Sequence, residues 1–247
     1  MRDYFFPEMQ QRNTSDKEKL ELAGVDLHRL QRTIRQFKLI NYLLSGSRRL
    51  LCRHFFSVME REPHRMYTLL EVGAGGCDIA VWAAREARRR GLKLSITALD
   101  NDKNSLPMAY QAIRDYPEIS IVEGDALELG RLSSFDFVFS NHFLHHLEWD
   151  EIRLFLESIM ARTRIAFVMN DLKRSQWAYL GFTIFSGILT RGSYHFHDGR
   201  LSIRRAFLPE EFRSFLQENF PDKRIQVLET YPARIVLVHS VRESSVR

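Results

Sequence analysis

The sequence contains few of the residues that mark disulfide-stabilised or zinc-binding proteins. Only two cysteines, Cys52 and Cys77, occur among 247 residues, and no CxxC pair is present. Two cysteines are too few for the disulfide framework of a secreted domain, and without CxxC spacing they do not indicate a zinc or redox motif. We therefore expect the reducing cytoplasm as the compartment of this protein.

Long apolar runs are also absent. The longest, Trp177 to Leu189, has 13 residues, whereas a membrane-spanning helix needs about 20. In the opening stretch MRDYFFPEM, Asp3 and Pro7 interrupt the apolar region that an export signal requires, so we expect no such signal. The apolar run predicts a buried helix, and peripheral contact with a membrane surface is the alternative.

The composition is that of an ordinary globular protein, and its pattern predicts an α/β fold. Hydrophobic residues make up 45% of the chain and charged residues 27%, which excludes disordered and collagen-like classes. Residues 15–62 show helical periodicity with a break at Ser45-Gly46. Strands are then expected to alternate with helices in a parallel sheet, at 68–72, 94–99, 119–122, 135–139 and 165–169. Runs at 224–229 and 233–241 predict a terminal antiparallel pair.

A glycine-rich turn follows the first expected strand. The segment Leu69 to Asp78 reads LLEVGAGGCD and leads into a helix over 79–90. Gly73 and Gly75 allow a sharp turn close to a ligand, beside the free N–H groups of a helix N-terminus. Asp78 stands where a dinucleotide fingerprint has its third glycine, and a carboxylate there would repel a pyrophosphate. The turn therefore disfavours a nicotinamide cofactor and favours a ligand that carries an amine.

Acidic residues end the next two expected strands. Asp100 follows the strand at 94–99, where a carboxylate can accept hydrogen bonds from both hydroxyls of a ribose. Asp125 follows the strand at 119–122 and could receive an adenine amino group, with a helix-capping role as the alternative. The fourth strand runs into the segment Ser140 to Leu147, which reads SNHFLHHL.

In this order and spacing, the four segments resemble the class I S-adenosylmethionine-dependent methyltransferases over roughly residues 66 to 170. Glu71-x-Gly73-x-Gly75 matches the first motif of the family, and Cys77 departs from it because many members have a third glycine there. The resemblance implies S-adenosylmethionine as the cofactor. The residues that it assigns to this cofactor are Glu71, Gly73, Ala74, Gly75, Asp100, Asn101, Asp125, Ala126 and Asn141.

The resemblance also implies an architecture. A Rossmann-like class I methyltransferase fold has a seven-stranded, mostly parallel sheet with a terminal antiparallel hairpin. We expect N-terminal helices as a cap over residues 1–65 and the methyltransferase domain over 66–247. Residues 172–206, a helical insertion after the fifth strand, are expected to form the substrate side, since ligands of open α/β folds bind at that edge of the sheet.

The segment SNHFLHHL resembles the small-molecule group that includes ubiquinone- and menaquinone-type methyltransferases. It lacks the Asn/Asp-Pro-Pro-Tyr/Phe clamp used on exocyclic amines, and the chain has no Pro-Cys dipeptide for attack on cytosine. We therefore expect methylation of a small apolar or aromatic metabolite, lipid-like, polyketide-like or carrier-bound, with O-methylation ahead of C-methylation. The candidate catalytic residues are His142 and His145, and the candidate substrate-side residues are His142, Asn170, Arg174, Tyr194 and His197. On a strand, His195 and His197 would share one face.

No catalytic metal is expected. Metal-dependent catechol methyltransferases place acids after strands four and five, whereas only Asp171 follows the fifth strand here.

Two alternatives stay open: an RNA or protein methyltransferase, which the formal net charge of +5 suggests, and a non-catalytic subunit that binds S-adenosylmethionine. The location of the charge bears on the first. Residues 172–206 contain six basic residues and one acid, so this segment carries the whole excess. Such a concentration favours an acidic or phosphate-bearing amphipathic substrate, or an anionic carrier, over a nucleic-acid face.

Overall fold

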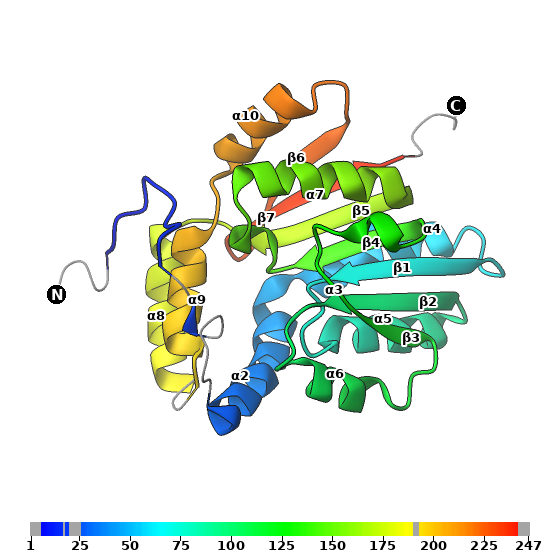
Figure 1. The fold of residues 1–247 in the computed structure, drawn as a ribbon, viewed down its shortest axis with the longest axis horizontal. Coiled ribbons are helices and arrows are strands. Elements are labelled where there is room, and N and C mark those ends of the chain that lie inside the picture. Colours follow the sequence, from blue (N-terminus) through cyan, green and yellow to red (C-terminus); the bar gives the residue numbers. More distant parts are fainter. Residues whose placement is uncertain (1–5, 17, 20–25, 190–192, 242–247) are drawn as a thin grey trace.

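The computed structural model describes residues 6–16, 18–19, 26–189 and 193–241 (Figure 1). Seven strands form one sheet in the order β3-β2-β1-β4-β5-β7-β6. The first five are parallel, and β7 pairs antiparallel with both β5 and β6. This sheet confirms the expected class I methyltransferase fold. The strands are β1 (Met66–Val72), β2 (Lys93–Asp100), β3 (Ile119–Glu123), β4 (Phe135–Asn141), β5 (Thr163–Leu172), β6 (Ile225–Thr230) and β7 (Arg234–Ser240).

Helices cover both faces of the sheet, as a parallel sheet requires. Short π-helical turns continue two of them, at Asn41–Ser45 and Cys52–Phe56, and single 3₁₀ turns lie at Leu129–Arg131 and Leu144–His146. The helices are α2 (Leu27–Ile40), α3 (Ser47–Leu51), α4 (Ser57–Met59), α5 (Asp78–Arg90), α6 (Leu106–Ile113), α7 (Trp149–Arg162), α8 (Gln176–Leu189), α9 (His195–Arg205) and α10 (Pro209–Asn219).

The alternation of side chains along the strands builds one core on each face. In β1, Leu69 joins the core formed with α3 and α5, while Leu70 joins the core formed with α7 and α10. Every residue of β4 is buried, which places this strand at the centre of the sheet. The near-continuous apolar runs that predicted these strands therefore reflect burial on both faces.

The N-terminal helices break where the sequence predicts. Gly46 has a φ of 67°, in the left-handed region that glycine favours. The chain turns there between the π-helical end of α2 and the start of α3. Its reversal carries Ser45 and Ser47 to the C-terminal edge of the sheet, where both are buried.

The apolar run Trp177 to Leu189 lies in helix α8, as expected, and α8 packs against α9. In Figure 1 the two helices stand side by side beyond the C-terminal ends of the parallel strands. His195 and His197 lie on helix α9, so the strand geometry considered for them is wrong. Within the described residues, no helix is long and apolar enough to cross a membrane.

We predict that Asp136→Ala lowers the free energy of unfolding and leaves the structure at the C-terminal edge of the sheet unchanged. Asp136 is 1% exposed and accepts hydrogen bonds from Arg65 at 2.6 Å and from the backbone of Thr68 at 3.0 Å. Losing a buried charged acceptor of this kind costs about 2 kcal/mol. Glu157→Ala is the control, because its pair with Arg153 is exposed and such pairs contribute about 0.5 kcal/mol. Equal unfolding free energies of the two variants in urea would contradict the prediction.

Candidate functional site

The glycine turn between β1 and α5 has the backbone conformation that its sequence predicts. Gly73 and Gly75 have φ values of 69° and 49°. A Cβ on Gly73 would lie 3.1 Å from Cδ2 of Phe143, whereas a Cβ on Gly75 would meet no atom within 4 Å. The backbone N–H groups of Gly73 and Ala74 donate to the carbonyl of Leu99 at 2.9 and 3.1 Å, which fixes the turn against β2. Space for a ligand therefore remains on the Gly75 side of the turn.

Cys77 stands where many members of the family have a third glycine, and its backbone conformation is the one that glycine favours. It has a φ of 56°, so its backbone adopts the left-handed conformation for which glycine is the usual residue. Its side chain is buried. Burial raises the pKa of the Cys77 thiol, and neighbouring Glu71 adds to the rise. The thiol is accordingly a small packing group and not a nucleophile.

Three carboxylates surround the turn. Asp100 accepts hydrogen bonds from the backbone of Gly75 at 2.6 Å and of Asp102 at 2.8 Å. Asp78 faces Asn41, whose amide nitrogen lies 3.3 Å from both of its oxygens. Burial raises the pKa values of Asp78 and Asp100. Buried carboxylates of this kind are stabilised by a cation placed among them.

Glu71 is the most deeply placed of the three. Its side chain is buried, and Oε2 has no hydrogen-bond partner among the residues that the structure describes. Burial raises the pKa of Glu71 well above its ordinary value, and the nearby charge of Asp78 raises it further. A positively charged donor from a ligand would satisfy this oxygen.

Three other residues expected at the cofactor follow the C-terminal ends of β2 and β3. Asn101 and Asp125 are exposed, and Ala126 is buried. Asp125 accepts a hydrogen bond from the backbone of Leu127 at 2.9 Å, which stabilises the turn that follows β3. The backbone of Gly124 donates to the carbonyl of Asp100 at 3.1 Å, so these two strand ends lie together.

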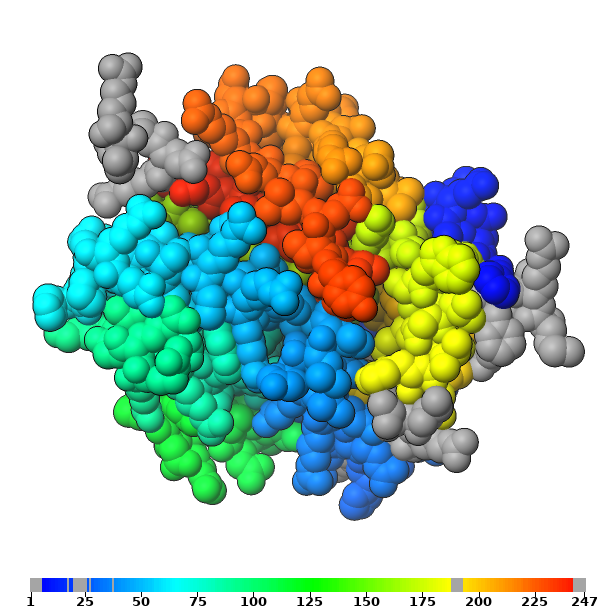
Figure 2. All heavy atoms as spheres, turned by 180° about the vertical axis from the view of Figure 1, so that it is seen from behind, coloured from blue at the N-terminus to red at the C-terminus, as the bar shows by residue number. Residues whose placement is uncertain are grey.

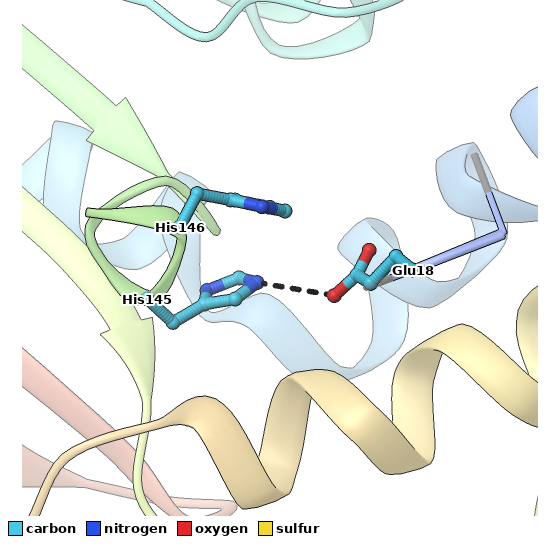
Figure 3. A group of neighbouring side chains, drawn as sticks. All are labelled: Glu18, His145 and His146. Carbon is cyan, nitrogen blue, oxygen red and sulfur yellow. Dashed lines mark ion pairs between the residues drawn. The ribbon is translucent and has the colours of Figure 1, made fainter. Parts of the chain in front are cut away.

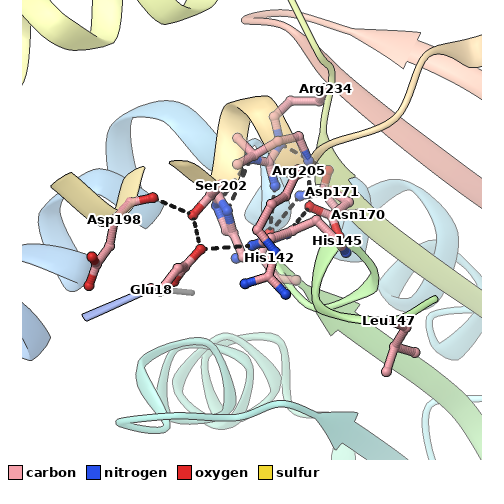
Figure 4. Close-up of polar contacts among 12 residues, drawn as sticks. Glu18, His142, His145, Leu147, Asn170, Asp171, Asp198, Ser202, Arg205 and Arg234 are labelled. Atoms are coloured by element: carbon pink, nitrogen blue, oxygen red, sulfur yellow. Dashed lines mark hydrogen bonds and ion pairs between the residues drawn. The ribbon is translucent and has the colours of Figure 1, made fainter. Parts of the chain in front are cut away.

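A buried polar network joins the ends of β4, β5 and β7 (Figure 4). The Asn141 side-chain oxygen accepts from Asn170 at 2.8 Å, from Arg234 at 3.0 Å and from Ser47 at 3.2 Å. Asn170 also donates to the carbonyl of Ser45 at 2.8 Å. Asn170, expected on the substrate side, is 1% exposed and is occupied by these contacts. Its side chain holds neighbouring residues in place and does not itself line the cavity described below.

Arg234 is a site residue that the sequence reasoning missed. It is 1% exposed, and burial lowers its pKa to about 10, although Asp171 opposes that shift. Its Nη1 donates to Nε2 of His142 at 3.0 Å. An arginine at the start of the otherwise apolar run 233–241 was the signal that could have identified it.

The two candidate catalytic histidines have different surroundings. His142 has a φ of 56° at the end of β4, and burial together with Arg234 lowers the pKa of its ring well below the ordinary value. His145 is 2% exposed, and its Nδ1 lies 2.7 Å from Oδ1 of Asp171. Burial alone would raise the pKa of Asp171, but the adjacent His145 outweighs it and the pKa is lowered.

A cavity of about 510 Å³ lies beside His142, between the N-terminal helices and the segment 172–206. Figure 2 shows α2 in blue, α8 in yellow and the turn between β6 and β7 in orange-red meeting on one face. The acidic, basic and histidine side chains that line the cavity are those of Glu18, His142, His195, Asp198 and Arg234. The apolar lining comes from several elements and includes Ile40, Leu44, Leu172, Phe182, Phe185 and Ile203.

Three other residues expected on the substrate side lie elsewhere. Arg174 donates to the carbonyl of Ala206 at 2.6 Å and forms an ion pair with Glu211, and its side chain is fully buried by these contacts. The hydroxyl of Tyr194 accepts from the backbone of Asp26 at 3.0 Å. His197 is exposed and contacts Asp198 at 2.8 Å. None of the three lines the described cavity, whereas His195, on the opposite side of α9 from His197, does.

Three of the six basic residues of segment 172–206 pair with acids from other parts of the chain. Lys173 pairs with Glu229 at 2.5 Å, and Arg204 pairs with Asp16 at 3.5 Å. With Arg174 also paired, the charge of the segment does not reach the described cavity lining, and Arg191 lies outside the described residues. The expectation of an acidic or phosphate-bearing substrate therefore stays a prediction.

Comparisons with known proteins agree with this geometry. Residues 69–164 match the family model described as a methyltransferase domain. Among curated proteins, none matches the chain significantly.

Solved structures share the fold at low sequence identity. A SAM-dependent methyltransferase from Aquifex aeolicus is 14% identical with a TM-score of 0.57, and the match covers 88% of this chain and 100% of that one. The plantazolicin methyltransferase BpumL, solved with a desmethylPZN analog and SAH, is 12% identical with a TM-score of 0.63, covering 86% and 91%. Human N-acetylserotonin methyltransferase, solved with SAM, is 14% identical with a TM-score of 0.58, covering 86% of this chain and 56% of that one.

The matched segment contains the glycine turn, the acid at the end of β2 and the whole of β4, and the sheet around it has the strand order of this fold. Residues 69–164 therefore match the methyltransferase domain family, and the chain has the fold shared by S-adenosylmethionine-dependent methyltransferases.

Proposed function

We propose that the protein transfers the methyl group of S-adenosylmethionine to a small apolar or aromatic metabolite held in the cavity beside His142. The observation that carries this proposal is the apolar cavity at the C-terminal edge of the sheet, where open α/β folds bind their ligands. Three methyltransferases of similar fold are named for N-acetylserotonin, plantazolicin and magnesium protoporphyrin IX. All three are non-nucleic-acid molecules, which supports a small acceptor here.

The cofactor fits the residues around the glycine turn. When bound, S-adenosylmethionine supplies an activated methyl group on a sulfonium, so the protein needs chiefly to align an acceptor with it. The unpartnered Oε2 of Glu71 suits the ammonium group of the cofactor, and Asp100 suits its ribose hydroxyls. The open space at Gly75 allows close approach of the ligand.

A hydroxyl is the acceptor group that the cavity favours over carbon. His142, Ser202 and Tyr231 line a predominantly apolar space and offer polar contacts that can orient an acceptor oxygen. We assign His142 the role of contacting the acceptor, because it lies at the end of β4 and also lines the cavity. His145 is absent from the described lining and is assigned no contact with the acceptor.

We also propose the division of the chain into a helical cap over 1–65, a methyltransferase domain over 66–247 and a substrate-side insertion at 172–206. Ile40 and Leu44 of the cap line the cavity, as do Phe182 and Phe185 of the insertion. The thiols of Cys52 and Cys77 are free, which supports the cytoplasm as the compartment.

Asp100→Ala is expected to weaken binding of S-adenosylhomocysteine by about 1 to 3 kcal/mol, because a partly buried charged acceptor of the ribose is lost. Calorimetric titration measures this loss. Glu123→Ala is the matched control, because Glu123 pairs in register with Asp100 on β3 but has an exposed side chain. An unchanged affinity in a folded Asp100→Ala variant would refute the ribose assignment.

Ala178→Trp is expected to exclude the acceptor while the cofactor still binds. Ala178 lines the cavity from α8, so the added ring occupies the space of the acceptor. With an acceptor identified by a screen for S-adenosylhomocysteine release, we expect at least a tenfold lower kcat/KM. Ile184→Trp adds similar bulk on the same helix at a side chain that is 55% exposed, and it serves as the control. Equal kcat/KM values for both variants would place the acceptor elsewhere.

A further inference from the structure

Glu18, His145 and His146 converge although they come from distant parts of the chain. Each offers one metal-binding atom, and these atoms all lie within 4.8 Å of one another (Figure 3). The histidines lie in and at the end of the 3₁₀ turn after β4, and Glu18 reaches them from the N-terminal segment. Glu18 and His145 are buried, with 5% and 2% exposure.

We propose that these three side chains bind a divalent first-row transition-metal ion such as Zn²⁺. Two imidazoles and one carboxylate form a donor set that such ions prefer, and three protein ligands leave a coordination position open. Ligand atoms of a tetrahedral zinc ion lie about 3 to 4 Å apart. The separation of 3.8 Å between His145 Nε2 and Glu18 Oε1 is within that range.

The hydrogen bonding of His145 supports a cation at this point. Its Nδ1 lies 2.7 Å from Oδ1 of Asp171, and its backbone N–H donates to Oδ2 of the same carboxylate at 2.9 Å. With Nδ1 facing Asp171, the other ring nitrogen, Nε2, faces the carboxylate of Glu18. The distance of 3.8 Å is too long for a hydrogen bond. An ion between these two atoms would be bound by both, with the other ring nitrogen of His145 held by a carboxylate, as in established metal sites.

The carboxylate of Glu18 is also held in place. The hydroxyl of Ser202 donates to its Oε1 at 2.5 Å, as Figure 4 shows. Arg12 fixes the same N-terminal segment by donating to the carbonyls of His145 at 2.8 Å and Leu147 at 2.7 Å. Hydrogen-bonded supports of this kind orient the ligands in established metal sites.

The proposed ion site borders the acceptor cavity, because Glu18 and Ser202 both line that cavity. The expectation of no catalytic metal rests on the residues that follow the fourth and fifth strands. The present group takes its carboxylate from the N-terminal segment instead. The inference goes beyond the proposed function, since the ion site does not depend on which acceptor is methylated.

Cobalt titration of the full chain, without a histidine tag, tests the site. Co²⁺ replaces Zn²⁺ in such sites and its visible d–d absorption reports His and carboxylate ligation. We expect saturation at one equivalent and reversal of the signal by Zn²⁺. His146→Gln and Glu18→Gln are expected to weaken binding at least tenfold, whereas His64→Gln, which changes an exposed histidine, leaves it unchanged.

S-adenosylhomocysteine titration of each variant separates this inference from the proposed function. Retained cofactor binding with lost cobalt binding supports the ion site. Absent saturation in the unaltered chain, or unchanged cobalt affinity in both Glu18→Gln and His146→Gln, overturns it whatever the cofactor result. If Glu18→Gln does not fold, Ser202→Ala takes its place, with an expected loss of about tenfold because only a supporting hydrogen bond is removed.

Discussion

The site depends on the burial of one guanidinium group, that of Arg234. A buried cation is stable only if its donors are satisfied, and Arg234 has partners at the ends of two neighbouring strands. It donates to Asn141 at 3.0 Å and to Asn170 at 3.3 Å. These contacts join the C-terminal ends of β4 and β5 to the start of β7, and the same guanidinium group orients the ring of His142.

The N-terminal helices attach to this point and not simply to the hydrophobic core. Ser45 and Ser47 reach the same asparagines through the reversal at Gly46. Farther along, Ile34 of α2 lies 3.0 Å from the position that a Cβ of Gly76 would occupy. The N-terminal helices therefore contact the glycine turn and the ends of β4 and β5 at once.

The sheet could be predicted from the sequence because its central strands are apolar on both faces, and the glycine turn could be predicted because left-handed backbone favours glycine. The acceptor side could not be predicted in the same way. Arg174 and Lys173 look like ligand contacts until Glu211 and Glu229, far along the chain, are brought against them. His195 was set beside His197 by spacing alone, but the helical period of α9 separates them. Pairing between distant residues leaves no trace in local periodicity.

The cavity draws its walls from both ends of the chain, from Glu18 to Arg234. During synthesis the cap leaves the ribosome first, yet its partners on β5 and β7 are made more than a hundred residues later. Ser45, for example, is separated from Asn170 by 125 positions. Contacts of such separation form late in folding, since a long loop must close before they are gained. The cavity is therefore complete only when segments from both ends of the chain have packed together.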